Sequence, residues 1–567
     1  MRGIPWRLLA AAALTALLLD LPFPIAGPLP AWRAVFAWFA LVPLVVAVLR
    51  LPVTQAGRSI RWQLGWSLLT GWLSGALWFG ANCYWVYGTM HLYAGLNAPL
   101  AVLALVLFSL YLGFWFGAFA LVLAIIHRAT RSNGVTWLTL VAIPFLWTAM
   151  EFALARIPEF PWDLLGYSQV DNAWLSQLAP WTGVYGISFV LAAVNALLVA
   201  GFVLSRGAGS FPANRRCTVL GVALIILGMA GTLVHPQHPA TSQVAMLVQP
   251  NLDVATDDAW AGPDWDRHMA EFQRLASETC EGYLAGMPQT GAPVVANIDC
   301  TAVPPTSLIA WPESPAPFRE MDPRFQTGMA ALARTNHSPM IVGTVGMDDD
   351  PANRKYLVYN SASVITQEGQ FIGRYDKIHL VPFGEYIPLR SAFFFLHKIV
   401  QDMPDMSTGR SRESFPLKSA DGNTHRYGIF ICYESVFGDE VRQFARNGAE
   451  VLVNISDDGW YGDTSAPWQH LNMARMRAIE NRRWLLRDTN NGVTSSIDPY
   501  GTVRQSIPRH QVDSLAAFFA YNSALTFYTL HGDLLPGLCA ILTLVLLAWS
   551  GRMLLYPKAA ESSSKAA

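Results

Sequence analysis

Long apolar segments recur along this chain and restrict it to folds that cross a lipid bilayer. A helix needs about 20 consecutive apolar residues to span the hydrocarbon core of a membrane. The chain of 567 residues is 52% hydrophobic and only 14% charged, which is too apolar for an ordinary soluble protein. We therefore predict an α-helical membrane domain, with about eight spans in the whole chain. The predicted spans are 8–26, 34–50, 64–82, 97–126, 136–155, 183–205, 217–235 and 533–555.

Basic residues lie mainly in alternate loops between these spans. Cytoplasmic loops of membrane proteins carry an excess of Lys and Arg. The residues of the basic loops and ends are Arg2, Arg7, Arg50, Arg58, Arg61, Arg128, Arg131, Arg206, Arg215, Arg216, Arg552, Lys558 and Lys565. The other short loops contain only Arg33 and Arg156. Both chain ends are therefore predicted to face the cytoplasm, and the long segment 236–530 is predicted to lie on the opposite side.

The segment 236–530 differs from the spans around it, because it carries most of the charge and alternates short strands with helices. Strands are predicted at Val244–Val248, Leu308–Trp311, Met340–Thr344, Tyr356–Ile365, Ile429–Ile431 and Val451–Ile455, and helices at Arg267–Leu275, Pro323–Thr335, Gly438–Asn447 and Pro467–Asn481. Apolar strands among helices indicate an α/β layered domain with a buried sheet. The expected domains are 1–235 with seven spans, 236–530, and 531–567 with the eighth span and a cytoplasmic tail.

The sequence shows no signal for a cofactor, a metal ion or nucleic acid. It contains neither a GxGxxG nor a Walker loop, and no pair of its six cysteines, at positions 83, 217, 280, 300, 432 and 539, has metal-site spacing. The net charge of −1 provides no basic surplus for nucleic acid. We therefore expect no cofactor, no metal ion and no nucleic-acid partner.

Cys432 lies at a predicted strand-to-helix elbow within Arg426–Phe437. Tyr427–Ile431 is typical of a buried strand, and Gly438–Asn447 has helical spacing. Such an elbow places its corner residue at the carboxyl edge of a sheet, facing a cleft. The N-terminus of the following helix favours an anion and lowers the pKa of a nearby thiol. We therefore expect a reactive thiolate at Cys432, with a small core residue as the alternative.

Two further stretches end strand-like runs with ionisable residues. Leu308–Ser314 contains Glu313, and Gly373–Pro388 contains Lys377 and Glu385. A carboxylate of raised pKa can serve as the base that a thiol needs, and a fixed cation can hold a thiolate and then an oxyanion. Taken singly, these residues could instead be a helix cap, a surface charge and a loop residue. Together with a cysteine they would supply a base, an electrostatic stabiliser and a nucleophile.

These stretches together resemble the nitrilase superfamily, whose members use a Glu–Lys–Cys triad on an α-β-β-α sandwich. The resemblance continues through Asn454–Gly462, Pro467–Glu480 and Thr489–Thr494. From end to end the chain is similar to one branch of that superfamily, the apolipoprotein N-acyltransferases, which place this domain between spans seven and eight. Pro158–Gln169 and Val248–Asn251 resemble segments of that branch as well. The implied fold is a polytopic α-helical membrane domain plus a nitrilase-like α/β sandwich.

The resemblance implies a two-step acyl transfer. Cys432 would attack an acyl ester of a phospholipid, become a thioester and release a lysophospholipid. The α-amine of a diacylglyceryl-cysteine apolipoprotein would then accept the acyl chain. Glu313 would take and return protons, and Lys377 would stabilise charge. The resemblance also implies a multi-pass enzyme of the inner membrane of a Gram-negative-type bacterium, surrounded by membrane lipids, with its catalytic domain in the periplasm.

Further site positions follow from the same resemblance. Glu385 and Glu434 would support the site, and Tyr433 would shape it. Trp460 and Tyr461 would lie on loops near the acyl chain.

An early tryptophan also matters in the family. We assign this position to Trp260, with Trp265 as the alternative, because the spacing after Asn251 does not separate them. The neighbouring stretch 278–305 is similar to an insertion, and it contains Cys280 and Cys300. In an oxidising periplasm we expect these two cysteines to pair.

The chain departs from the family pattern at several loop positions. Pro250 stands where the family usually has Gly, and Asp457–Tyr461 replaces the commoner Asn-Asp-Ala-Trp-Phe. Arg482–Trp484 replaces Gly-Arg-Pro, and Asp488 is unusual beside Thr489. None of these changes removes a triad member, so they bear on loop contacts and substrate preference.

Two other functions compete with acyl transfer. The first is a carbon–nitrogen hydrolase, in which water replaces the amine; a soluble amidase needs no membrane spans. The second is a transporter or receptor with a non-catalytic external domain, which predicts polar or broken spans along a path. Replacing Cys432 separates these classes, because a transporter should survive Cys432→Ala and either enzyme should not.

Overall fold

The computed structural model describes residues 6–51, 59–130, 136–203, 211–236, 239–254, 265–277, 306–313, 318–350, 355–386 and 406–555. The chain forms two compact units. The membrane unit combines Met1–Tyr84, Val102–His235 and Asp533–Ala567, and the sandwich unit combines Trp85–Ala101 and Pro236–Gly532. The sandwich unit therefore includes Trp85–Ala101, hereafter the arm, most of which lies between the predicted spans 64–82 and 97–126.

Six helices among the described residues are long and apolar enough to cross a membrane, which confirms the helical membrane domain. They are Ala31–Leu49, Ala98–Thr130, Trp137–Arg156, Val184–Phe202, Arg215–Leu233 and Leu534–Leu555. The predicted spans 8–26 and 64–82 correspond to α1 (Trp6–Asp20) and α3 (Ile60–Asn82). Helix α1 has 15 residues, and the 23-residue α3 buries polar side chains such as Gln63 and Thr70. These two helices thus differ from the six in length or in composition.

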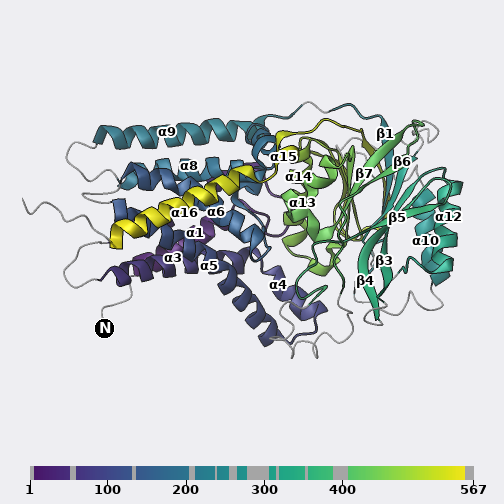
Figure 1. The fold of residues 1–567 in the computed structure, drawn as a ribbon, viewed down its shortest axis with the longest axis horizontal. Coiled ribbons are helices and arrows are strands. Elements are labelled where there is room, and N and C mark those ends of the chain that lie inside the picture. Colours follow the sequence, from purple (N-terminus) through teal and green to yellow (C-terminus); the bar gives the residue numbers. More distant parts are fainter. Residues whose placement is uncertain are drawn as a thin grey trace, which may run out of the picture. The chain divides into compact units, whose positions relative to one another are not determined.

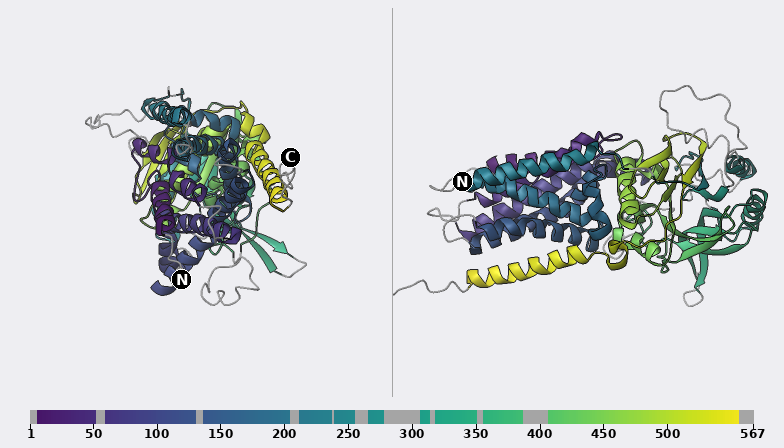
Figure 2. Two further views of the ribbon diagram at one scale, coloured as in Figure 1. Left: turned by 90° about the vertical axis from the view of Figure 1, so that its left-hand side faces the viewer. Right: turned by 90° about the horizontal axis from the view of Figure 1, so that it is seen from above.

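The helices of the membrane unit lie side by side, as Figures 1 and 2 show. Helix α6 (Trp137–Arg156) contacts α8 (Val184–Val203) and α16 (Leu534–Leu555), and α8 contacts α9 (Phe211–Ala230).

Helices α3 and α5 (Ala98–Thr130) approach each other through glycines. A Cβ at Gly71 would lie 2.4 Å from the carbonyl oxygen of Phe116, and one at Gly113 would lie 2.5 Å from the amide nitrogen of Ala76. Small residues allow close helix packing where lipid provides no hydrophobic drive.

Among the described residues, the sandwich unit contains two six-stranded sheets (Figure 1). The first sheet has the order β12-β1-β2-β3-β4-β5 and the second has the order β11-β10-β9-β8-β7-β6. The first is built from β1 (Gln243–Gln249), β2 (Thr306–Trp311), β3 (Met340–Asp350), β4 (Lys355–Ile365), β5 (Phe371–Asp376) and β12 (Asp513–Phe519). The second is built from β6 (Ser414–Lys418), β7 (Thr424–Ile431), β8 (Val451–Ser456), β9 (Leu485–Thr489), β10 (Thr494–Ile497) and β11 (Val503–Ile507).

Alternating side chains divide each sheet between two apolar layers. On β1, Val244 and Met246 join a buried cluster with α10 (Trp265–Ser277) and α12 (Pro323–Thr335). The intervening Ala245 and Leu247 join a cluster that reaches the second sheet, α13 (Gly438–Arg446) and α14 (Ala466–Asn481). Because successive side chains on a strand point to opposite faces, one strand serves both layers. The result is the α-β-β-α sandwich that the sequence predicts.

The central strands of both sheets are parallel. Strand β2 pairs in parallel with β1 and β3, and β8 pairs in parallel with β7 and β9. In open parallel sheets the loops at the carboxyl ends of the strands form the ligand crevice. Residues that directly follow β2, β7 and β8 are therefore the ones positioned for function.

Candidate functional site

The described residues bring the three predicted triad members to neighbouring strand ends. Glu313 follows β2 of the first sheet, Lys377 follows β5 of the same sheet, and Cys432 follows β7 of the second sheet. All three side chains are buried. The site is therefore assembled from both layers of the sandwich.

Lys377 lies between two carboxylates. Its Nζ is 3.1 Å from Oε1 of Glu313 and 2.9 Å from Oε1 of Glu385, and its side chain is 1% exposed. Burial alone would lower the pKa of Lys377, but the charges of Glu313 and Glu385 outweigh it and hold that pKa well above its ordinary value. The lysine is thus a fixed cation in the resting site.

Glu313 is held at both of its oxygens. The side-chain amide of Asn360 on β4 donates to Oε1 at 2.6 Å, and the main-chain N–H of Asp457 donates to Oε2 at 2.9 Å. The same amide donates to Oε1 of Glu385 at 2.7 Å, and the N–H of Val381 donates to Oε2 of Glu385 at 2.7 Å. Asn360 therefore bridges the two predicted carboxylates. The sequence places this residue only within a strand, and nothing in its spacing marks it.

Cys432 occupies a left-handed backbone conformation, with φ of 48°. Burial raises the pKa of its thiol well above the ordinary value, the charge of Glu313 adds to this effect, and the charge of Lys377 opposes it. The expectation that a helix N-terminus lowers this pKa is therefore wrong. A short 3-10 segment, η9 (Cys432–Val436), intervenes before α13 begins. The resting thiol is neutral and needs a base at the moment of attack.

Glu434 accepts hydrogen bonds from the residues around the cysteine elbow. Its Oε2 accepts from the N–H of Ile431, the residue before the cysteine, at 2.7 Å. Its Oε1 accepts from the N–H of Ile378 at 2.6 Å and from the hydroxyl of Tyr375 at 2.7 Å. Glu434 thus links the cysteine elbow of the second sheet to the lysine segment of the first.

Asp457 is an acid beside the predicted base. It is 1% exposed, and its Oδ1 accepts from the N–H of Gly459 at 3.0 Å and from the amide of Asn490 at 3.2 Å. Burial and the charge of Glu313 raise the pKa of Asp457 to about 8. The raised pKa favours the protonated carboxyl at neutral pH.

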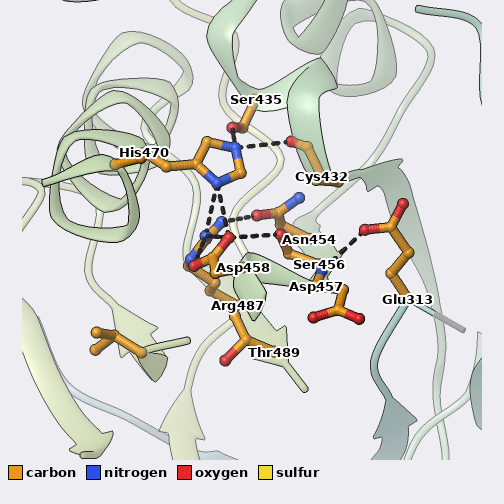
Figure 3. A network of polar contacts seen from close by, with 12 residues as sticks. Glu313, Cys432, Ser435, Asn454, Ser456, Asp457, Asp458, His470, Arg487 and Thr489 are labelled. Carbon is orange, nitrogen blue, oxygen red and sulfur yellow. Dashed lines mark hydrogen bonds and ion pairs between the residues drawn. The ribbon is translucent and has the colours of Figure 1, made fainter. Parts of the chain in front are cut away.

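A buried polar network lies on the other side of Cys432 (Figure 3). Nε2 of His470 lies 3.0 Å from the carbonyl oxygen of Cys432, and its Nδ1 lies 2.9 Å from Oδ1 of Asp458. Nη2 of Arg487 donates to Oδ2 of Asp458 at 2.8 Å. Burial would raise the pKa of Asp458, but the charge and the hydrogen bond of Arg487 hold it below its ordinary value. The sequence places Asp458 and His470 only within segments 454–462 and 467–481, and it gives neither residue nor Arg487 a role.

The predicted aromatic loop residues meet the arm. Trp460 and Tyr461 belong to η10 (Asp458–Tyr461). The ring centroid of Tyr461 is 5.1 Å from that of Trp85, and that of Trp460 is 5.5 Å from that of Tyr93. The arm runs through α4 (Trp85–Gly88) and η2 (Thr89–Tyr93), a π-helical turn. Such turns are frequent at functional sites.

The remaining predicted positions are placed as follows. Tyr433 is buried next to the nucleophile, with its ring edge-on to Phe437 at 5.2 Å. Trp265 begins α10 and packs on Phe318 and beneath the guanidinium of Arg324, within the outer cluster of the first sheet. Trp260, Cys280 and Cys300 lie outside the described residues, so the early-tryptophan assignment and the disulfide stay predictions.

Comparisons with known proteins agree over almost the whole chain. The family model described as Apolipoprotein N-acyltransferase N-terminal domain matches residues 15–197, and the one described as Carbon-nitrogen hydrolase matches residues 267–511. A protein of Geobacter metallireducens named apolipoprotein N-acyltransferase is 32% identical over 543 residues, covering 95% of this chain and 94% of the relative. Proteins of the same name from Pseudomonas putida and Chlorobaculum tepidum are 32% and 28% identical, over 90% and 93% of both chains.

Proposed function

The chain belongs to the apolipoprotein N-acyltransferase family, and we propose that it transfers an acyl chain from a phospholipid to the α-amine of a diacylglyceryl-cysteine apolipoprotein through a thioester on Cys432. Family membership makes it a membrane-bound acyltransferase that acts on lipid and lipoprotein. The donor, the acceptor and the residue roles are the parts of this proposal that need a test.

In the first step the thiol of Cys432 attacks the ester carbonyl carbon of the phospholipid. Glu313 takes the thiol proton as the S–C bond forms, and Lys377 stabilises the negative charge that develops. The C–O bond of the ester then breaks, and Glu313 returns the proton to the leaving alkoxide. The products are an acylated Cys432 and a lysophospholipid.

In the second step the free α-amine of the acceptor attacks the thioester carbonyl carbon. Glu313 takes a proton from the amine as the N–C bond forms, and the C–S bond breaks. The thiolate leaves beside Lys377 and recovers the proton from Glu313. An amide-linked acyl chain and the free thiol of Cys432 result.

One observation carries this assignment of roles. Glu313 is fixed through both oxygens by Asn360 and the N–H of Asp457, while Lys377 contacts it at 3.1 Å. A base that is oriented in this way, next to a fixed cation and a neutral thiol, suits proton transfer coupled to thiol attack. Leu92 of the arm is exposed, and the ring of its neighbour Tyr93 packs against Trp460, which supports a substrate with an acyl chain.

We further infer that the sandwich unit lies on the periplasmic side of the inner membrane. The basic residues Arg50, Arg128 and Arg552 lie at the ends of spans whose loops are predicted to be cytoplasmic, which supports this orientation. Phospholipid and apolipoprotein are both anchored in the membrane, so an enzyme tethered by spans on both sides meets each of them there.

The test is the intact mass of the purified protein after incubation with phospholipid. We expect an added acyl mass on wild type and none on Cys432→Ala. The matched control is Cys539→Ala, which removes another buried free cysteine and should acylate normally. Discharge of the adduct by a diacylglyceryl-cysteine peptide supports the transferase, whereas discharge by water alone supports the hydrolase. A folded wild type that gains no mass would overturn the thioester route.

A further inference from the structure

The backbone of the nucleophile is strained, and it is held from both sides. Non-glycine residues rarely occupy the left-handed region, and they persist there where surrounding contacts fix them. Cys432 is in this region. The N–H of the preceding residue, Ile431, donates to Glu434, and the carbonyl oxygen of Cys432 contacts Nε2 of His470. The direction in which the sulfur leaves the backbone therefore depends on these two contacts.

The contact to the carbonyl oxygen decides which nitrogen of His470 carries a proton. A carbonyl oxygen can only accept, so the 3.0 Å contact is a hydrogen bond only if Nε2 bears the hydrogen. In the tautomer that is protonated on Nδ1, the lone pair of Nε2 would face the lone pairs of the carbonyl oxygen, and the two would repel each other. Nε2 also lies 2.7 Å from Oγ of Ser435, which can accept from the same N–H.

The contacts of Nδ1, on the other side of the His470 ring, are compatible with a proton on Nε2. Nδ1 of His470 lies 3.0 Å from Nη2 of Arg487 and 2.9 Å from Oδ1 of Asp458. A neutral ring accepts from Arg487 through Nδ1, and a charged ring donates to Asp458. Burial and the charge of Arg487 lower the pKa of His470, which favours the neutral ring. In the charged ring, and in the neutral ring whose Nδ1 accepts from Arg487, Nε2 carries a proton and faces the carbonyl oxygen of Cys432.

We propose that His470 is a positioning residue for the nucleophile, whose Nε2–H holds the Cys432 carbonyl and thereby aims the sulfur at the acyl ester. This inference rests on the proposed thioester chemistry of Cys432. Asp458 and Arg487 act one step further away by fixing the ring (Figure 3).

Two amide substitutions of His470 distinguish a role in positioning Cys432 from a role in core packing alone. The side-chain nitrogen of His470→Gln reaches the place of Nε2 and can donate to the Cys432 carbonyl. The nitrogen of His470→Asn reaches only the place of Nδ1, so it can meet Asp458 and Arg487 but not Cys432. Both variants lose the ring, and only Gln restores the hydrogen bond in question. Ser435→Ala removes the other neighbour of Nε2.

The experiment follows thioester formation on the full-length protein with phospholipid by intact mass in a single turnover, alongside the thermal unfolding midpoint of each variant. We expect His470→Asn to acylate about 10²-fold more slowly at saturating phospholipid, with little change in the phospholipid concentration for half-maximal rate, since a misplaced reactive group loses rate on this scale. We expect His470→Gln and Ser435→Ala to stay within about fivefold of wild type, since the bond to the carbonyl is kept.

Each outcome bears on the proposal. Equal slowing of Gln and Asn variants that remain folded would overturn it, because loss of the ring would then be the cause. A wild-type rate for a folded His470→Asn would overturn it as well. If Asn does not fold, a folded but 10²-fold slower Gln variant still refutes it. A wild type that forms no thioester would instead refute the proposed function, and alkylation of Cys432 by iodoacetamide would then compare the thiol directly between the variants.

Discussion

The hydroxyl of Thr89 donates a 3.0 Å hydrogen bond to the main-chain carbonyl of Trp460, although 371 positions separate the two residues. Trp460 is two residues beyond Asp458, which contacts His470, and three beyond Asp457, whose N–H holds Glu313. The arm therefore touches the loop that orients the predicted base and the nucleophile.

We predict that Thr89→Val slows thioester formation about threefold to tenfold, because a hydrogen bond of this kind contributes roughly 0.5–1.5 kcal/mol. The shape of the side chain is kept, so the unfolding midpoint should hardly move. Thr70→Val is the matched control, since the hydroxyl of Thr70 bonds to the carbonyl of Trp66 in its own helix. Equal rates for the two variants would show that the arm contact does not affect the site.

Glu313→Gln should keep the shape of the side chain and the hydrogen bonds to one of its oxygens, and lose the base. We expect acylation to slow by about 10²–10⁴-fold, the usual contribution of a positioned acid–base group. Single-turnover intact mass measures this rate. Glu320→Gln, which alters a carboxylate paired with Arg374 at 2.8 Å, should acylate normally. Retention of more than a tenth of the rate by Glu313→Gln would remove Glu313 from the proposed role.

Lys377→Met should unfold more easily as well as lose activity. Removing one partner of a buried ion pair typically costs about 3–5 kcal/mol, because the other charge stays buried without compensation. Here Glu313 and Glu385 would remain together without a cation. The double variant Lys377→Met/Glu385→Gln has one carboxylate fewer, so we expect it to recover part of the unfolding midpoint but not the activity. A midpoint for the double variant below that of Lys377→Met would contradict this explanation.

Asp457 should make the protein less stable as the pH rises. An aspartate has an ordinary pKa of 3.8, and the pKa of Asp457 in the folded protein is about 8. Between these values the folded state binds a proton that the unfolded state has released, so the free energy of unfolding falls by up to about 1.4 kcal/mol per pH unit. The effect is fully developed above pH 8 and absent below pH 4.

Asp457→Asn tests this dependence, because the amide keeps the shape and has no proton to lose. We expect the variant to exceed wild type in unfolding midpoint at pH 8 and the difference to shrink towards pH 5. Asp463→Asn, at a largely exposed carboxylate near His510, should follow wild type at both values. A constant difference between Asp457→Asn and wild type across this range would place the pKa of Asp457 near its ordinary value.

Much of the fold follows from local pattern. Apolar runs predict the membrane helices, and the continuous apolar run Val244–Val248 predicts a strand with two buried faces. The positions of Glu313, Lys377 and Cys432 at strand ends follow from the same pattern together with the family resemblance. Such inferences succeed because each depends on residues that are close in sequence.

The unpredicted features depend on contacts between distant segments. Asn360 is one polar residue in a strand until β4 brings it to Glu313 and Glu385. The elbow at Cys432 predicts a lowered thiol pKa, but burial and the carboxylate of Glu313 reverse that direction. Similarly, the sequence marks His470 only as part of a helix. Burial and electrostatic potential at a site depend on all the residues packed around it, and most of these residues are distant in the sequence.

The strand order also determines when the catalytic domain can fold during translation. Strand β12 is the last strand of the sandwich in the chain, and it pairs with β1, the first, from Gln243 with Phe519 to Gln249 with Asp513. The layer that carries Glu313 and Lys377 is therefore incomplete until the ribosome has passed Phe519. A nascent chain therefore holds Cys432 before this sheet can close, and acquisition of activity waits until Phe519 has left the ribosome.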